Sequence, residues 1–180
     1  MKSNSSLNMV CEKILNSSLS QKRQPNPSLK ATIISEPLLD MIKQKWGEEL
    51  LGVILFGSAV RSEEREDSDI DLLLVLQSGA SLSRKYYEEW NQLVDQRRNK
   101  GQIQPPWPPL RKISPHFVQL PKDPLSIGGL WYEVSIEGII LWQQGNEVQN
   151  ILRNIRHLIS EGKLQRKYSH GHPYWIKMYS

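Results

Sequence analysis

The sequence predicts an α/β (α+β) fold with a mixed central sheet and helices packed against it. Short apolar runs, which are typical of buried strands, alternate with longer stretches whose apolar residues recur every three or four positions, as on amphipathic helices. The clearest runs, residues 50–56 and 72–76, are far shorter than the ~18 residues that a membrane-spanning helix needs. A chain of 180 residues has the ordinary length of one domain.

The first half of the chain predicts helices and strands in alternation. They are an amphipathic helix over 36–51, a buried strand over 52–56, a short helix from Ala59 and a second buried strand over 70–76. One apolar stripe indicates the first helix: Leu38, Leu39, Ile42, Trp46 and Leu50. Both strands are continuous apolar runs, and Gly57 ends the first of them.

The second half continues this alternation. The predicted elements are a helix over 81–98, a strand over 113–120, a helix over 125–134, a strand over 138–142 and a last helix over 146–162. The Pro-rich stretch 104–109 is expected to be an extended connector. Residues 1–30, rich in Ser and Asn, are expected to form a flexible arm.

Composition and charge narrow the compartment and the partners. Cys11 is the one cysteine, so no disulfide can form within the chain, and Met1–Ser20 has no continuous apolar segment of the kind that secretory signals carry. A cytoplasmic location is therefore expected, with no membrane as partner. Residues 1–72 have a net charge of −2 and residues 73–180 of +6, a split that suits a metal ion and a polyanion.

Two pairs of residues carry the chemistry. Gly57 and Ser58 end a strand and open a helix, which leaves backbone N–H groups facing a place where a phosphate can bind. Eleven residues later, Asp69 and Asp71 begin the second strand with both carboxylates on one face, where they can hold one or two divalent cations. Each pair alone is a weak signal, but together they predict a site for a metal ion and a nucleotide.

The stretch from Leu55 to Val75 resembles the DNA polymerase beta-like nucleotidyltransferase superfamily, in particular its minimal nucleotidyltransferase group. The motif of that group reads Gly-Ser-x-Ala-Arg-Gly, followed by Ser-Asp-Ile-Asp-Leu at the spacing found here. The matching positions are Gly57, Ser58, Arg61, Ser68, Asp69, Ile70, Asp71 and Leu72. Val60 and Ser62 depart from the motif, and neither change removes a ligand.

This resemblance implies a nucleotidyltransferase fold and an enzyme that transfers a nucleoside monophosphate from a nucleoside triphosphate, with ATP expected, to an acceptor. It implies that Asp69 and Asp71 are catalytic and hold Mg²⁺ or Mn²⁺, and that Gly57, Ser58 and Arg61 bind the nucleotide. The chain then divides into an arm (1–30), a nucleotidyltransferase domain (31–145) and a C-terminal helix with a basic aromatic tail (146–180).

One departure from the family bears on catalysis. Members usually place a third carboxylate on a later strand, but the corresponding stretch here, residues 111–120, contains no Asp or Glu. His116 and Glu133 are the alternatives, although a lone strand His is more often structural and Glu133 is expected on a helix surface. On spacing alone, Arg61 is equally compatible with an ion pair to Glu64 or Glu66.

The acceptor and the partners stay open at this level. The acceptor can be a small molecule, a nucleic acid or a partner protein, and a partner protein can complete the site. One alternative is a catalytically weak or inactive binding module, such as an antitoxin-type partner of a second protein. Another is a nucleic-acid-binding protein that uses the aromatic and basic residues of the tail, although these residues can equally anchor the C-terminus on the core. They are Tyr168, Tyr174, Trp175 and Tyr179 with Arg166, Lys167 and Lys177.

Overall fold

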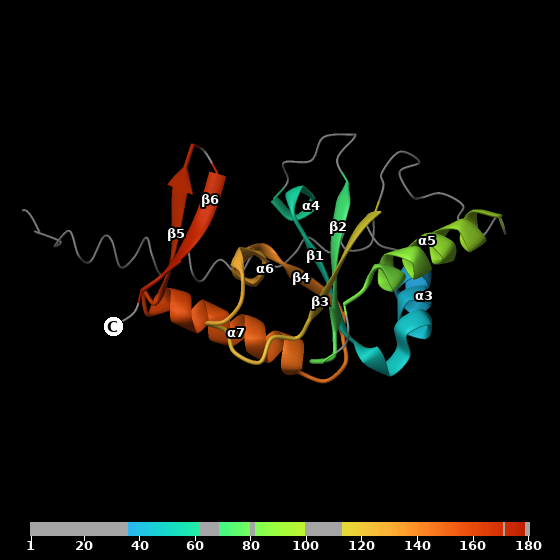
Figure 1. Cartoon of the computed structure of the whole chain (residues 1–180), viewed down its shortest axis with the longest axis horizontal. Helices are drawn as coiled ribbons and strands as arrows, with labels where there is room; N and C mark the ends of the chain where they lie inside the picture. The colour runs from blue at the N-terminus through green and yellow to red at the C-terminus, as the bar shows by residue number, and fades with distance from the viewer. Residues whose placement is uncertain (1–35, 62–68, 80–81, 100–112, 171, 179–180) are drawn as a thin grey trace, which may run out of the picture.

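A four-stranded sheet lies between two pairs of helices, and a separate two-stranded hairpin stands beside them (Figure 1). The computed structural model describes residues 36–61, 69–79, 82–99, 113–170 and 172–178. The predicted arm (1–30) and connector (104–109) lie outside these residues. The elements are α3 (Glu36–Trp46), η1 (Gly47–Glu49), β1 (Leu50–Phe56), α4 (Ser58–Arg61), β2 (Ile70–Leu76), α5 (Arg84–Asn99), β3 (Ile113–Gln119), α6 (Gly129–Glu137), β4 (Ile139–Gln143), α7 (Glu147–Ser160), β5 (Leu164–Ser169) and β6 (His172–Lys177).

The sheet is mixed, as predicted, with the strand order β3-β2-β1-β4. β1 pairs antiparallel with both β2 and β4, whereas β2 pairs parallel with β3. The β1–β2 register sets Phe56 opposite Asp71, so the end of the first strand meets the start of the second. This confirms the predicted α/β (α+β) class and places the two halves of the motif at one end of the sheet.

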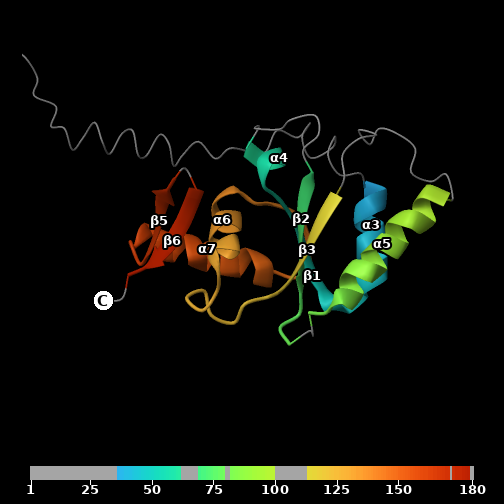
Figure 2. The same cartoon turned by 45° about the horizontal axis from the view of Figure 1, so that its top comes forward.

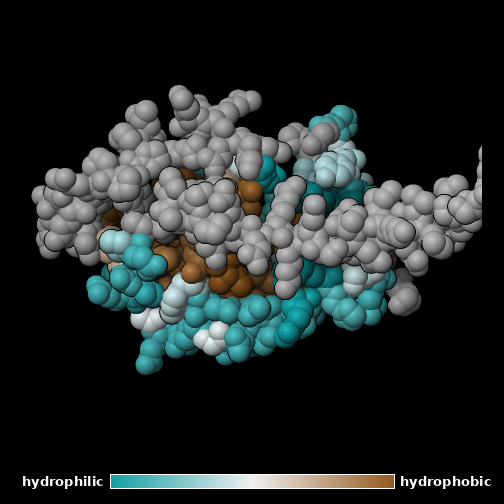
Figure 3. All heavy atoms as spheres, turned by 180° about the vertical axis from the view of Figure 1, so that it is seen from behind, coloured by the Kyte–Doolittle hydropathy of each residue, from teal (hydrophilic) through white to brown (hydrophobic). Residues whose placement is uncertain are grey.

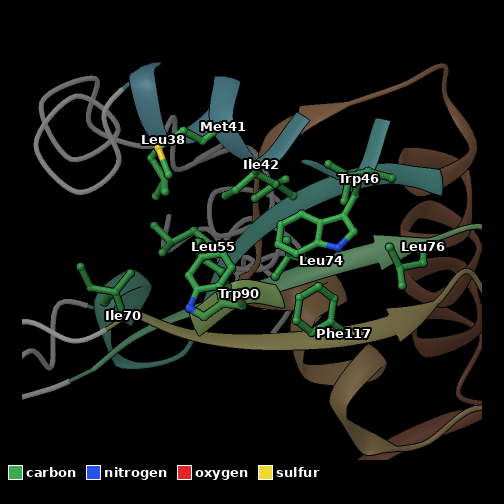
Figure 4. Close-up of a cluster of buried hydrophobic side chains, with 14 residues drawn as sticks. Leu38, Met41, Ile42, Trp46, Leu55, Ile70, Leu74, Leu76, Trp90 and Phe117 are labelled. Carbon is green, nitrogen blue, oxygen red and sulfur yellow. The ribbon is translucent and has the colours of Figure 1, made fainter. Parts of the chain in front are cut away.

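The sheet is buried on both faces. Leu72 and Leu74 face the core cluster that α3 and α5 complete, while Leu73 and Val75 face the cluster completed by α6 and α7. This two-sided burial explains why β2 is a continuous apolar run rather than an alternating one. On the α3 and α5 face, Trp46 stacks on Trp90 at 6.1 Å between ring centroids, and Phe117 meets Trp46 edge-on (Figure 4).

The predicted helix over 36–51 is wrong at its C-terminal end. The helix α3 ends at Trp46, and Gly47 takes a φ of +50°, a conformation that commonly terminates helices. Leu50 is the first residue of β1, not part of the helix. Because Leu50 is buried in the same core cluster as Trp46, its spacing fitted the helical stripe although the backbone had already changed direction.

The helix predicted over 125–134 lies about four residues later in the chain, as α6. A turn centred on Asp123 occupies the expected start, since the Leu125 N–H donates to Asp123 Oδ1 and the Ser126 N–H to the Asp123 carbonyl. Asp side chains favour such turns over helix. At the other end, α6 continues to Glu137.

The C-terminal segment that was expected as a basic aromatic tail forms the antiparallel hairpin β5–β6. Leu164 is buried in the α6 and α7 core cluster, and the ring of Trp175 lies 5.4 Å from that of Tyr132 on α6. Trp175 therefore anchors the hairpin on the core, which was one of the two uses expected for the tail aromatics. Tyr168 and Tyr174 stay exposed.

The described surface is hydrophilic over its lower part and has hydrophobic residues gathered in the middle of the rear face (Figure 3). β4 is an edge strand of the sheet, and Ile139 to Trp142 are only half-buried. Within the described ranges, no helix combines the length and the apolar character needed to cross a membrane.

The packing of the core predicts that two Leu→Ala variants differ strongly in their free energy of unfolding. Leu74→Ala removes a side chain that is 0% exposed, and the cavity should lower the free energy of unfolding by about 2–5 kcal/mol. Leu82→Ala removes the same atoms from a side chain that is 48% exposed and should change it by less than about 0.5 kcal/mol. Urea denaturation measures both, and equal losses would contradict this packing.

Candidate functional site

α4 follows the end of β1, which the sheet register sets beside the start of β2 (Figure 2). Gly57 follows β1 with a φ of +79°, a conformation that side-chain-bearing residues rarely adopt. A Cβ atom at Gly57 would overlap the Asp71 carboxylate at Oδ2. Position 57 thus requires glycine for two reasons: the positive φ of the backbone and the close approach of the Asp71 carboxylate.

Asp69 and Asp71 hold different positions at the start of β2. Asp69 precedes the strand and is exposed, whereas Asp71 lies within it with a side chain that is 29% exposed. Strand alternation puts Asp71 on the same sheet face as Leu73 and Val75, the face covered by α6 and α7. Asp71 is therefore enclosed on one side by the sheet yet still open to a ligand.

His116 occupies the neighbourhood in which the third carboxylate was sought. Its Nε2 lies 3.3 Å from Asp71 Oδ1, a hydrogen bond that requires a proton on Nε2. The imidazole also packs edge-on against Phe56 at 5.2 Å between centroids. The parallel β2–β3 register, which sets Ser114 opposite Asp71 and His116 opposite Leu73, brings the two side chains together.

Arg61 forms an ion pair with a residue that is distant in the sequence. Its Nη1 donates to Glu137 Oε2 at 2.8 Å, across 76 positions of the chain. Glu64 and Glu66, the expected ion-pair partners, lie outside the described residues. Arg61 is thus held at the end of α4 by the last residue of α6.

Glu133 lies on α6 and is partly exposed, and its carboxylate contacts the hairpin β5–β6. Its carboxylate accepts hydrogen bonds from Arg166 Nε at 3.1 Å, from Arg166 Nη2 at 2.5 Å and from Trp175 Nε1 at 2.7 Å. Sequence reasoning did not single out Glu137, and it considered Arg166 only as a basic residue of the tail. The one available signal was that Glu133 and Glu137 are four residues apart on a predicted helix and so share a face.

The donors at Asp69 and Asp71 fit a hard divalent cation. Carboxylate oxygens are the ligands that Mg²⁺ and Mn²⁺ prefer, and the Asp71 side chain is 29% exposed. Among the residues that the structure describes, no group of three or more His, Cys, Asp or Glu is arranged to hold a metal ion. The carboxylates of Asp69 and Asp71 have the chemistry that would suit such an ion.

Comparison with solved structures finds weak overall likeness. A toxin–antitoxin complex with AMP-PNP is 15% identical with a TM-score of 0.46, over 72% of this chain and 90% of that chain. A tri-AMPylated Shewanella oneidensis HEPN toxin in complex with MNT antitoxin is 14% identical with a TM-score of 0.41, over 71% of this chain and 84% of that chain.

Sequence comparison is more specific. A Methanocaldococcus jannaschii protein, named as a candidate protein adenylyltransferase, is 45% identical over 42 residues, which are 23% of this chain and 29% of that protein. The alignment thus spans less than a third of that relative. Residues 36–119 match the nucleotidyltransferase domain family. This match contains the whole motif from Gly57 to Asp71 and supports the resemblance: residues 36–119 are similar to the nucleotidyltransferase domain family.

Proposed function

We propose that this chain transfers a nucleoside monophosphate from a nucleoside triphosphate to a hydroxyl group of an acceptor protein. ATP is the expected nucleotide, with Mg²⁺ or Mn²⁺ held by Asp69 and Asp71. The observation that carries the proposal is the Asp71 carboxylate, enclosed by Gly57 and His116 at the end of a nucleotidyltransferase sheet. A protein acceptor is supported by the name of the adenylyltransferase relative.

The reaction replaces a phosphoanhydride bond of the nucleotide with a phosphodiester bond to the acceptor. The acceptor oxygen forms a bond to the α-phosphorus, the bond from that phosphorus to the bridging oxygen breaks, and pyrophosphate leaves as the acceptor hydroxyl loses its proton. When bound at Asp69 and Asp71, Mg²⁺ supplies positive charge that offsets the charge on the transferred group. The catalytic demand on the protein is therefore placement and charge rather than covalent chemistry.

The chain's own residues divide this work. Gly57 leaves room beside Asp71, and Ser58 offers a hydroxyl donor to a phosphate at the start of α4. His116 fixes the orientation of Asp71 through Nε2. Arg61 brings a guanidinium, which suits phosphate oxygens because it is planar and always charged.

The first prediction concerns the carboxylates. Asp69→Asn/Asp71→Asn should abolish Mg²⁺-dependent binding of nucleoside triphosphates, since amides are much weaker ligands for a hard cation. Calorimetric titration of ATP, GTP, CTP and UTP measures this loss. The control is Asp40→Asn/Asp95→Asn, which makes the same change of net charge on α3 and α5 and should leave binding unchanged. Equal loss in both double variants would overturn the assignment.

A second prediction separates backbone strain from the close approach. Gly57→Ala and Gly79→Ala both place a side chain at a positive φ and should each destabilise the fold by about 1 kcal/mol or more. Only Gly57→Ala brings a methyl group onto Asp71, because nothing lies within 4 Å of a Cβ at Gly79. Nucleotide binding should therefore fail in Gly57→Ala alone. Loss in both variants, at matched stability, would attribute the effect to strain.

A third prediction identifies the transferred group. ATP labelled at the α-phosphate should label the acceptor protein, whereas ATP labelled at the γ-phosphate should release its label as pyrophosphate. Denaturing electrophoresis of the reaction distinguishes the two. Transfer of the γ-label would make the chain a kinase and refute nucleotidyl transfer.

A further inference from the structure

Two glutamates on one face of α6 join three parts of the chain that are distant in sequence. Glu137 accepts a hydrogen bond from Arg61 of the motif at 2.8 Å, and its other oxygen lies 3.7 Å from Arg166 Nη2 on β5. Glu133 binds the same Arg166 through both of its oxygens and also accepts from Trp175 on β6. The motif helix α4 and the hairpin β5–β6 are thus linked through α6.

The position of the hairpin agrees with this link. α6 lies between the hairpin and the sheet, and α4 stands near the end of the sheet toward which the hairpin rises (Figures 1 and 2). Arg166, through Glu137, therefore connects a C-terminal element with the residue that ends the motif helix.

The ion pairs are sheltered enough to fix geometry. The side chain of Glu137 is 17% exposed and those of Glu133 and Arg166 are 26% exposed, so water screens these groups less than it screens fully exposed charges, whereas the Arg61 side chain is 40% exposed. The contact of Arg166 with Glu133 uses two nitrogens on two oxygens, the geometry that holds a guanidinium in one orientation. Arg166 also forms an ion pair with Glu137, with Nη2 lying 3.7 Å from Glu137 Oε1.

We propose that Glu137 is a positioning residue of the nucleotide site, which orients Arg61 toward the triphosphate and is itself held in place by Arg166 of the hairpin. This inference rests on the proposed function, because it requires that the site bind a nucleoside triphosphate. A guanidinium that is already oriented loses less side-chain freedom when phosphate binds. Weakening the link therefore weakens nucleotide binding although none of the linking residues need touch the nucleotide.

The direction of the change in Mg·ATP affinity of Glu137→Gln distinguishes a positioning role from a simple charge effect. Glu137→Gln makes the protein more positive by one unit, so simple electrostatics predicts tighter binding of an anionic nucleotide. Loss of positioning predicts the opposite, a dissociation constant for Mg·ATP that rises about three- to tenfold. Arg61→Gln should raise it by about tenfold or more.

The experiment measures Mg·ATP binding to the whole chain by calorimetry, for the wild type, Arg61→Gln, Glu137→Gln and the double variant. If Glu137 acts through Arg61, Glu137→Gln should add nothing in the Arg61→Gln background. Independent, additive effects would mean a merely structural role and would overturn the inference. The kinetic counterpart is a raised KM for ATP with kcat little changed.

Two adjacent residues of β5 allow a controlled test of the contact between Arg166 and Glu137. Arg166→Gln and Lys167→Gln remove the same charge from adjacent positions of β5, but Lys167 is exposed on the opposite face of the hairpin. Only Arg166→Gln should weaken ATP binding beyond the shared charge effect. The core contacts of Leu164 and Trp175 should keep both variants folded, which thermal unfolding verifies.

The outcomes distinguish failure of the positioning role from failure of the proposed function. No ATP binding by the wild type refutes both. Binding that Arg61→Gln weakens, but that Glu137→Gln and Arg166→Gln leave unchanged or strengthen, refutes the positioning role and leaves the proposed function intact. If Glu137→Gln fails to fold, Glu137→Asp replaces it, with the same expected rise in the dissociation constant.

Discussion

The contact between Gly57 and the Asp71 carboxylate is the constraint on which the site depends. It exists because the antiparallel register of β1 and β2 sets Phe56 opposite Asp71, and that register is fixed by leucines buried on both sides of the sheet. A slip of one residue would exchange the two faces of β2 and turn Asp71 away. The hydrophobic core therefore determines the geometry of the polar site, because the packing of Leu72 to Leu76 determines where the Asp71 carboxylate points.

Much of this arrangement is local and could be predicted from the sequence. The bounds of β2 agree with its apolar run, and the proximity of Asp71 to Gly57 follows from the antiparallel pairing of two strands that are successive in the sequence. The family match covers this same stretch. Local geometry and motif carried the prediction as far as the two carboxylates.

The rest depends on tertiary contacts that no local pattern encodes. The hydrogen bond from His116 to Asp71 requires the parallel β2–β3 pairing, and the contact of Arg61 with Glu137 joins residues 76 positions apart. Leu50 misled the helix prediction because burial against the same core preserved an apolar spacing beyond the end of α3. Glu133 looked like a surface residue because the hairpin that covers it comes 33 positions later.

The central claim is that Asp69 and Asp71 hold the metal beside the phosphates at Gly57. A crystal structure of the protein with Mn²⁺ and a non-hydrolysable ATP analogue tests it most directly, because the anomalous signal of manganese locates the ion independently of the surrounding atoms. The account predicts a manganese peak bound by oxygens of both carboxylates, with the nucleotide phosphates next to Gly57 and Ser58. Manganese bound elsewhere, or phosphates bound away from this end of the sheet, would contradict it.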